Sequence, residues 1–284
     1  ITILAQVRPD EIYNLAAQTF VGASFEQPIT TGEISGLGVT RMLDTIKSTK
    51  KDIKFYQASS SEMYGGVKKI PQDENTPFHP RSPYAAAKVY AHWITINYRE
   101  AYNLFACCGL LFNHESPLRG LEFVTRKITN SVAKIKLGLQ NELKLGNLNA
   151  MRDWGFAPNY VEAMWLMLQQ NKPEDFGIAT GETHTVKEFA KIAFNLVGLN
   201  YKDHVKIDKN FIRPSDVDLL VGNPAKAKSK LEWEPKIKFK ELIKIMLKED
   251  LDRWKKHLKG EAFPWDALHH GEWNTLPYEH KIDR

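Results

Sequence analysis

DIKFYQASSSEMYGG, residues 52–66, joins a short apolar run to a group of polar residues and a Gly-Gly turn. The pattern predicts a strand at residues 53–59. Pro83 then stands one residue before a long helical pattern at residues 84–102, where its missing N–H costs nothing. A strand followed by a long helix is the repeating unit of a parallel sheet that is covered by helices.

The same alternation of short apolar runs and helical patterns continues along the chain. The predicted strands are residues 11–16, 53–59, 104–113, 142–146 and 176–180. The predicted helices are residues 33–47, 84–102, 123–137, 160–170 and 186–197. Thr185 and Glu188 read as a capping box before the last of these, and Asn223-Pro224 opens a further helix. We therefore expect an α/β fold with a doubly wound parallel sheet.

The composition is ordinary for a globular protein, since 43% of the 284 residues are hydrophobic and 26% are charged. The net charge of +5 suits an anionic small molecule as well as nucleic acid, although solvated lysines explain it more simply. Because no aromatic residues interleave with the lysines, we expect no nucleic-acid partner. No apolar run approaches the roughly 18 residues of a membrane span, so we expect no membrane association.

Cysteine and histidine are sparse and unpatterned. Cys107 and Cys108 are neighbours in a predicted strand and so point to opposite faces, which predicts reduced core residues in a cytoplasmic protein. The nine histidines and two cysteines show no ligand spacing, so we expect no metal. The glycines Gly32, Gly36 and Gly38 fall in or beside a helical pattern rather than directly after a strand. We therefore expect the chain to begin partway through the sheet, without a glycine-rich phosphate-binding turn.

Four residues at the junction of the central strand and its helix form a possible catalytic group. Tyr84 and Lys88 are four apart on a predicted helix, so they share a face, and Ser60 and Glu62 share a side if the backbone stays extended. An ammonium group one turn away can stabilise a phenolate, which would let Tyr84 act as a base. Glu62 adds a second base, which simple alcohol oxidation does not require.

Each of these residues also has a simpler interpretation. Tyr-x-x-x-Lys occurs by chance, and Tyr64 and Lys68 repeat it in the Gly-Gly turn. Tyr84 could be an aromatic residue packed at a helix start, and Glu62 a solvated carboxylate at the end of a strand.

Around these residues the sequence resembles the GDP-mannose 4,6-dehydratases, a family of extended short-chain dehydrogenases/reductases. The resemblance runs from about Pro9 to about Leu251. The matching segments are YQASSSEMYG at 56–65, PRSPYAAAK at 80–88, LFNHESP at 111–117, FVTRKI at 123–128, RDWG at 152–155, YVEAMW at 160–165 and RPSDVD at 213–218. The blocks at 113–117 and 152–154 separate this family from other sugar-nucleotide epimerases and dehydratases.

The resemblance implies a lyase that removes water from GDP-mannose to give GDP-4-dehydro-6-deoxy-D-mannose. Tyr84 would take the proton of the 4-hydroxyl while C4 is oxidised by a recycled NADP. Glu62 would then remove the C5 proton as water leaves C6, which is afterwards reduced. Ser60 stands where the family usually has threonine and keeps the hydroxyl, and Lys88 would support Tyr84 and the nicotinamide ribose.

The resemblance also implies ligand contacts. The expected cofactor-binding residues are Leu15, Ala16, Ala17, Gln18, Thr19, Lys88, His114 and Arg119. The expected substrate-binding residues are Asn113, Lys127, Arg152, Arg213 and Asp216. The family usually has histidine and tyrosine where Phe20 and Thr30 stand, and more often glutamate in place of Asp216. His114 could instead cap a helix or loop, and Arg152 could form a surface ion pair with Asp153.

The expected architecture is a Rossmann-like, N-terminally incomplete sheet with a smaller mixed α/β substrate-binding domain. Residues 1–114 with about 152–182 would bind NADP, residues 115–151 with about 183–258 the sugar nucleotide, and 259–284 would form a tail. The family implies a homodimer or homotetramer that pairs the predicted helices 33–47 and 84–102. Two alternatives stay open: a related sugar-nucleotide dehydratase, epimerase or reductase, and a nucleotide-binding relative without catalysis.

Overall fold

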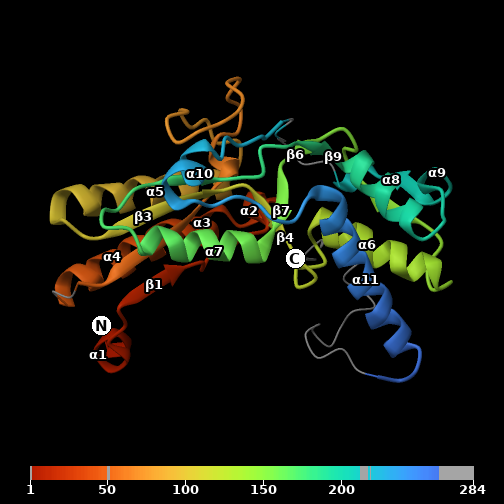
Figure 1. Ribbon diagram of the computed structural model, residues 1–284, viewed down its shortest axis with the longest axis horizontal. Helices are drawn as coiled ribbons and strands as arrows, with labels where there is room; N and C mark the ends of the chain where they lie inside the picture. The colour runs from red at the N-terminus through yellow and green to blue at the C-terminus, as the bar shows by residue number, and fades with distance from the viewer. Residues whose placement is uncertain (1, 50–51, 212–216, 218, 262–284) are drawn as a thin grey trace, which may run out of the picture. The chain divides into compact units, whose positions relative to one another are not determined.

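The chain forms two compact units, each built from three separate segments (Figure 1). The computed structural model describes residues 2–49, 52–211, 217 and 219–261. Unit 1 comprises Ile1–Asn113, Pro158–Glu182 and Leu220–Lys236. Unit 2 comprises His114–Ala157, Thr183–Leu219 and Ile237–Arg284.

Unit 1 is built on a parallel sheet in the order β1-β2-β3-β8. Its strands are β1 (Glu11–Asn14), β2 (Lys54–Ser60), β3 (Ala106–Leu111) and β8 (Phe176–Ile178). All three neighbouring pairs are parallel, and Asn14, the last residue of β1, lies opposite Gln57 in the middle of β2. The predicted α/β fold with a parallel sheet is therefore confirmed.

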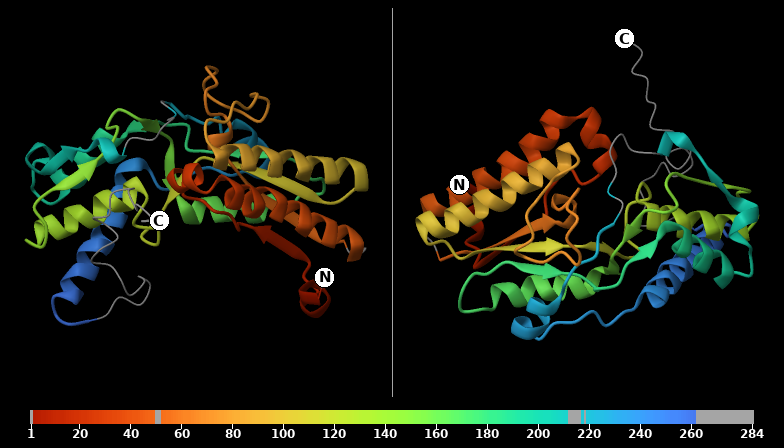
Figure 2. Two further views of the ribbon diagram at one scale, coloured as in Figure 1. Left: turned by 180° about the vertical axis from the view of Figure 1, so that it is seen from behind. Right: turned by 90° about the horizontal axis from the view of Figure 1, so that it is seen from above.

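Helices cover both faces of this sheet because successive strand residues point to opposite sides. Phe55 packs with Leu43 of α4 (Gly38–Thr49) and Ala91 of α5 (Pro83–Tyr102). Tyr56 faces the other side, against α7 (Ala157–Leu168) and α10 (Ala225–Leu231). Figure 2 shows α4 and α5 on one side of the strands and α7 on the other. Burying a side chain such as Phe55 contributes roughly 1.5–3 kcal/mol.

The helix that carries Tyr84 begins where the sequence predicts. Ser82 caps α5 by accepting a hydrogen bond from the backbone N–H of Ala85 (3.1 Å), and Pro83 takes the first helical position. The predicted helix at residues 33–47 is two elements, a π-helix η1 (Glu33–Leu37) and α4. The other helical elements of unit 1 are α1 (Thr2–Val7), α2 (Val21–Glu26), α3 (Pro28–Gly32) and η2 (Ser61–Met63).

Unit 2 has short strand pairs and a helical core. Its pairs are β5 (Leu143–Leu145) with β10 (Val205–Ile207), β4 (Asn113–Glu115) with β7 (Trp154–Phe156), and β6 (Met151–Arg152) with β9 (His184–Thr185). Its helical elements are α6 (Val124–Lys136), α8 (Val186–Leu196), α9 (Tyr201–His204), η3 (Lys209–Phe211) and α11 (Phe239–His257). Side chains from α6, α8 and α11 share one hydrophobic core.

Two local expectations need correction. The predicted strand at 104–113 ends at Leu111, since the chain turns to a different strand partner and forms β4 with β7. Thr185 caps α8 by accepting from the N–H of Glu188 (3.0 Å), but the Glu188 carboxylate pairs with His184 Nδ1 (3.0 Å) rather than closing a capping box. The Glu188 carboxylate is therefore engaged by the neighbouring His184 imidazole. The tail beyond Glu261 lies outside the described residues.

Candidate active site

Lys88 lies at the junction of β2 and α5. The side chain is 3% exposed, and its Nζ donates a hydrogen bond to the carbonyl oxygen of Ala58 (2.8 Å). Burial lowers the pKa of Lys88 to about 8, because water no longer solvates the ammonium group. A cation therefore sits at the carboxyl end of the central strand, the edge at which ligands bind in parallel sheets.

Tyr84 shares the helical face of Lys88. The tyrosine is buried in the first turn of α5, and the Lys88 Nζ lies 5.8 Å from the centre of its ring. The other Tyr-x-x-x-Lys match differs. The Tyr64 hydroxyl donates to the carbonyl oxygen of Asp73 (2.8 Å), and Lys68 is exposed. Only the pair on α5 combines a helical spacing with a buried ammonium group.

Ser60 and Glu62 are held by a helical turn rather than by an extended backbone. β2 ends at Ser60, and η2 begins at Ser61 because the Ser60 hydroxyl accepts the backbone N–H of Glu62 (3.2 Å). Because the backbone does not stay extended beyond Ser60, the side chains of Ser60 and Glu62 do not share one side of a strand. Within the described part of the chain, the Glu62 carboxylate has no hydrogen-bond or ion-pair partner. η2 also packs against α5, so all four residues belong to one junction.

A polar pair beneath this junction was not predicted from the sequence. The Ser59 hydroxyl and His92 Nδ1 are 3.1 Å apart, and both side chains are buried. Burial lowers the pKa of His92 to about 4, which keeps the imidazole neutral. His92 lies one helical turn beyond Lys88, so the spacing along α5 was the available signal.

The predicted cofactor segment follows β1 at the same edge of the sheet. Leu15, Ala16 and Thr19 are exposed, whereas Ala17 and Gln18 are half-buried. The Gln18 N–H donates to the Ser35 hydroxyl (3.0 Å), while its side-chain Oε1 is buried without a partner among the described residues. An unpaired buried acceptor is costly, so this segment fits a ligand that donates a hydrogen bond.

Three predicted ligand residues lie in β4 or in the loop that follows it. Asn113 Oδ1 is buried without a partner in the described part of the chain, which fits a ligand contact. His114 is half-buried. Arg119 pairs with Glu115 (3.2 Å), and its guanidinium group lies 3.5 Å from the centre of the Phe123 ring.

Two of the predicted substrate residues belong to described parts of unit 2. Lys127 Nζ lies 3.3 Å from the centre of the Phe211 ring, and burial lowers its pKa to about 8. Arg152 is buried and donates to the carbonyl oxygen of Val217 (2.6 Å), and Asp153 is buried too, so neither residue lies at the surface. Arg213 and Asp216 lie outside the described residues.

Among the residues that the structure describes, no helix is long and apolar enough to cross a membrane.

Comparison with known proteins identifies the family of this chain. A family profile described as GDP-mannose 4,6 dehydratase matches residues 1–246. The chain belongs to this family. GDP-mannose 4,6 dehydratase 1 of Arabidopsis thaliana is 58% identical over 250 residues, which cover 87% of this chain and 69% of the relative. The Homo sapiens GDP-mannose 4,6 dehydratase is 51% identical over 271 residues, 89% of this chain and 73% of the relative.

Solved structures share the fold. RMD from Pseudomonas aeruginosa, complexed with NADPH, matches with a TM-score of 0.80 at 24% identity, over 86% of this chain and 82% of that chain. UDP-glucose 4-epimerase from Thermotoga maritima, with UDP-glucose, matches with a TM-score of 0.78 at 26% identity, over 90% and 81%. The expected Rossmann-like fold is confirmed.

Proposed function

We propose that this member of the GDP-mannose 4,6-dehydratase family removes water from GDP-mannose, giving GDP-4-dehydro-6-deoxy-D-mannose, and that the β2–α5 junction is its active site. One observation carries the assignment of the site. Lys88 is a buried ammonium group one helical turn from Tyr84, at the strand end that also carries Ser60 and Glu62.

Tyr84 acts as the base for the sugar 4-hydroxyl. The Lys88 ammonium group stabilises the phenolate electrostatically, and its bond to the Ala58 carbonyl keeps it in place. The Ser60 hydroxyl, at the end of β2, hydrogen-bonds the reacting sugar oxygen. A bound nicotinamide cofactor supplies the oxidising and reducing equivalents, so no external redox partner is required.

Glu62 removes the C5 proton once C4 is a ketone. The ketone makes the C5 proton acidic, and the hydroxyl on C6 leaves as water. The partnerless Glu62 carboxylate suits this role, since a carboxylate already engaged in an ion pair would be a weaker base.

The nicotinamide cofactor is NADP in this proposal. The residues assigned to it are Leu15–Thr19, His114 and Arg119, as the family resemblance implies. The unpartnered Gln18 Oε1 supports a ligand at this segment. Parallel titrations with NADP⁺ and NAD⁺ test the choice, and tighter binding of NAD⁺ would refute it.

The nucleotide end of GDP-mannose binds to residues of unit 2 in this proposal. Lys127 and Arg152 are assigned to it together with Asn113, and Arg213 and Asp216 stay predictions from the resemblance. A half-buried cation such as Lys127 suits a diphosphate because its charge is incompletely solvated.

The activity is tested by incubating the protein with GDP-mannose and NADP⁺ and following the keto sugar by its absorbance in alkali. Glu62→Gln should abolish the product but still accumulate reduced nicotinamide, because oxidation at C4 precedes elimination. Glu100→Gln, an exposed carboxylate on α5, is the matched control and should behave as the wild type. A Glu62→Gln variant with the wild-type rate would refute the assignment of the C5 base.

We also propose a homodimer or homotetramer formed through the helices of unit 1. Ile29, Leu37, Tyr90 and Trp93 are exposed apolar residues of α3, η1 and α5, and a cavity of about 260 Å³ lies beside Tyr90. Exposed apolar groups of this kind mark interaction surfaces. Trp93→Asp should reduce the mass measured by light scattering, whereas Trp165→Asp, exposed on α7, should not. An unchanged mass for Trp93→Asp would count against this surface.

The proposed compartment is the cytoplasm. Cys107 and Cys108 are free and buried within β3. Reduced cysteines are usual for cytoplasmic proteins, and this observation supports the proposal.

A further inference from the structure

Glu115 is a buried carboxylate that the proposed reaction does not use. The side chain stands at the end of β4 and is 2% exposed. Its Oε2 accepts a hydrogen bond from the Thr125 hydroxyl (2.6 Å) and lies 3.2 Å from Arg119 Nε. Burying a carboxylate is costly unless partners compensate for the lost water, so Thr125 and Arg119 hold Glu115 in place.

Arg119 is contacted on two sides, by the Glu115 carboxylate through an ion pair without a hydrogen bond at Nε and by the Phe123 ring. Glu115 lies at its Nε edge, and the Phe123 ring lies against the plane of the guanidinium group at 3.5 Å. The side chain remains 25% exposed, and among the described residues Glu115 is its ion-pair partner. The planar group therefore keeps its terminal nitrogens for an anionic ligand, in an orientation that is set before the ligand arrives.

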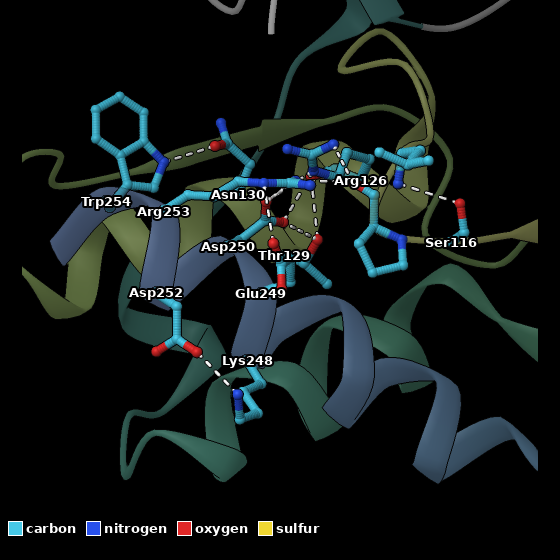
Figure 3. A network of polar contacts seen from close by, with 12 residues as sticks. Ser116, Arg126, Thr129, Asn130, Lys248, Glu249, Asp250, Asp252, Arg253 and Trp254 are labelled. Carbon is cyan, nitrogen blue, oxygen red and sulfur yellow. Dashed lines mark hydrogen bonds and ion pairs between the residues drawn. The ribbon is translucent and has the colours of Figure 1, made fainter. Parts of the chain in front are cut away.

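The backbone that carries Arg119 is fixed by a second set of charges. Arg126 Nη1 donates to the carbonyl oxygens of Pro117 (2.6 Å) and Arg119 (3.1 Å), and Arg253 Nη1 also donates to Pro117 (2.7 Å). Asp250 lies between the two arginines and pairs with both. Figure 3 shows Arg126 and Arg253 converging on Asp250, with Ser116 of the same loop nearby. Both the side chain and the backbone of Arg119 are thus held within unit 2.

We propose that Glu115 is a positioning residue that presents Arg119 to the dinucleotide cofactor. This inference rests on the proposed function, in which Arg119 contacts that cofactor. Glu115 itself touches no ligand. Its carboxylate removes the rotational freedom of Arg119, which would otherwise be lost on binding at a cost to affinity.

A double-mutant cycle on the full chain, read out as the dissociation constant of NADP⁺ by calorimetry, tests the proposal. In Glu115→Gln an amide oxygen in the place of Oε2 can still accept from the Thr125 hydroxyl, but the negative charge that pairs with Arg119 is gone, so Arg119 is held less firmly. NADP⁺ binding should weaken roughly 2- to 10-fold, the effect of one additional side chain ordered on binding. Arg119→Met should weaken it at least as much, and adding Glu115→Gln to Arg119→Met should change nothing more. Glu142→Gln, an exposed carboxylate of unit 2, is the control and should bind as the wild type.

The outcomes separate the inference from the proposed function. Wild-type protein that fails to bind NADP⁺ overturns both. If the wild type binds NADP⁺ and Arg119→Met binds it equally well, the inference alone is overturned. The inference is also overturned if Glu115→Gln weakens NADP⁺ binding by the same factor in the wild type and in Arg119→Met. If Glu115→Gln does not fold, Thr125→Val and Thr125→Ser replace it. Loss of affinity in the valine variant with recovery in the serine variant supports positioning, and equal affinities overturn it.

Discussion

Two aspartates on α11 predict very different effects of the same substitution. Asp250 is fully buried and accepts hydrogen bonds from Arg126 Nε (2.8 and 3.0 Å), the Thr129 hydroxyl (2.6 Å) and Arg253 Nη1 (3.3 Å). Asp252 forms an exposed pair with Lys248, whose side chains are 43% and 75% accessible. Figure 3 shows both aspartates on the same helix.

Asp250→Asn removes the buried anion that pairs with both Arg126 and Arg253, while Arg253 keeps the partly exposed Glu249 (3.5 Å) as a second partner. Breaking a buried ion pair by removing one partner costs about 3–5 kcal/mol, and an exposed pair contributes about 0–1 kcal/mol. At about 2–4 °C for each kcal/mol in a chain of this size, Asp250→Asn should lower the melting temperature by roughly 6–20 °C. Asp252→Asn should lower it by no more than about 4 °C.

Thermal and urea unfolding of the two variants, followed by circular dichroism under identical conditions, compare these values directly. The aspartate-to-asparagine change is the same in both, so helix propensity and size cancel. If Asp250→Asn lies within about 1 kcal/mol of Asp252→Asn, the cluster does not contribute as argued.

Three further predictions concern the β2–α5 junction and the sheet of unit 1. Lys88 releases its proton near pH 8 when folded and near pH 10.5 when unfolded, so the unfolded state binds more protons between these values and stability rises with pH. From pH 8 to 9.5, wild-type protein should therefore gain about 1.5 kcal/mol over Lys88→Met in urea unfolding, and no gain would disprove the burial argument. In Gly109→Ala the added methyl group would overlap the Tyr56 hydroxyl, which should lower the free energy of unfolding by about 1–3 kcal/mol. Adding Tyr56→Phe should restore part of this stability. Gly177→Ala, where a methyl group has ordinary space, is the control and should show no such loss in thermal unfolding. Ser82→Ala removes the α5 cap and should cost about 1 kcal/mol by urea unfolding, and a loss below about 0.3 kcal/mol would show that the cap is dispensable.

The expected site was predictable where chemistry follows from short-range spacing. Tyr84 and Lys88 are one turn apart in any helix, and the sequence PRSPYAAAK carries both the cap and the first-turn proline that start this helix at Pro83. The sequence predicted Glu62 as a catalytic residue, but it did not predict the helical turn on which Glu62 lies. Whether residues 60–62 stay extended depends on which acceptor the Glu62 N–H finds, and the Ser60 hydroxyl takes that role.

Contacts between distant segments were beyond the reach of sequence patterns. Arg152, which is predicted to bind the substrate, is buried and donates to the carbonyl oxygen of Val217, 65 residues away, a contact that no sequence pattern indicated. Ser59 and His92 are 33 residues apart and meet because α5 packs on β2. Such pairs form because buried polar groups require partners, and packing alone decides which partners are near.

The sequence by itself determined the strands of the parallel sheet, several of the longer helices including α5 and α8, and the family, because periodicity, caps and motifs act within a few residues. Only the tertiary structure decided which residues surround Arg119 and hold its backbone. Glu115 and Phe123 are near in the chain, but Asp250 and Arg253 reach the same loop from α11, more than 100 residues away. A charge cluster of this kind is specified by the exclusion of water where two helices pack together, a property that no short stretch of the chain contains.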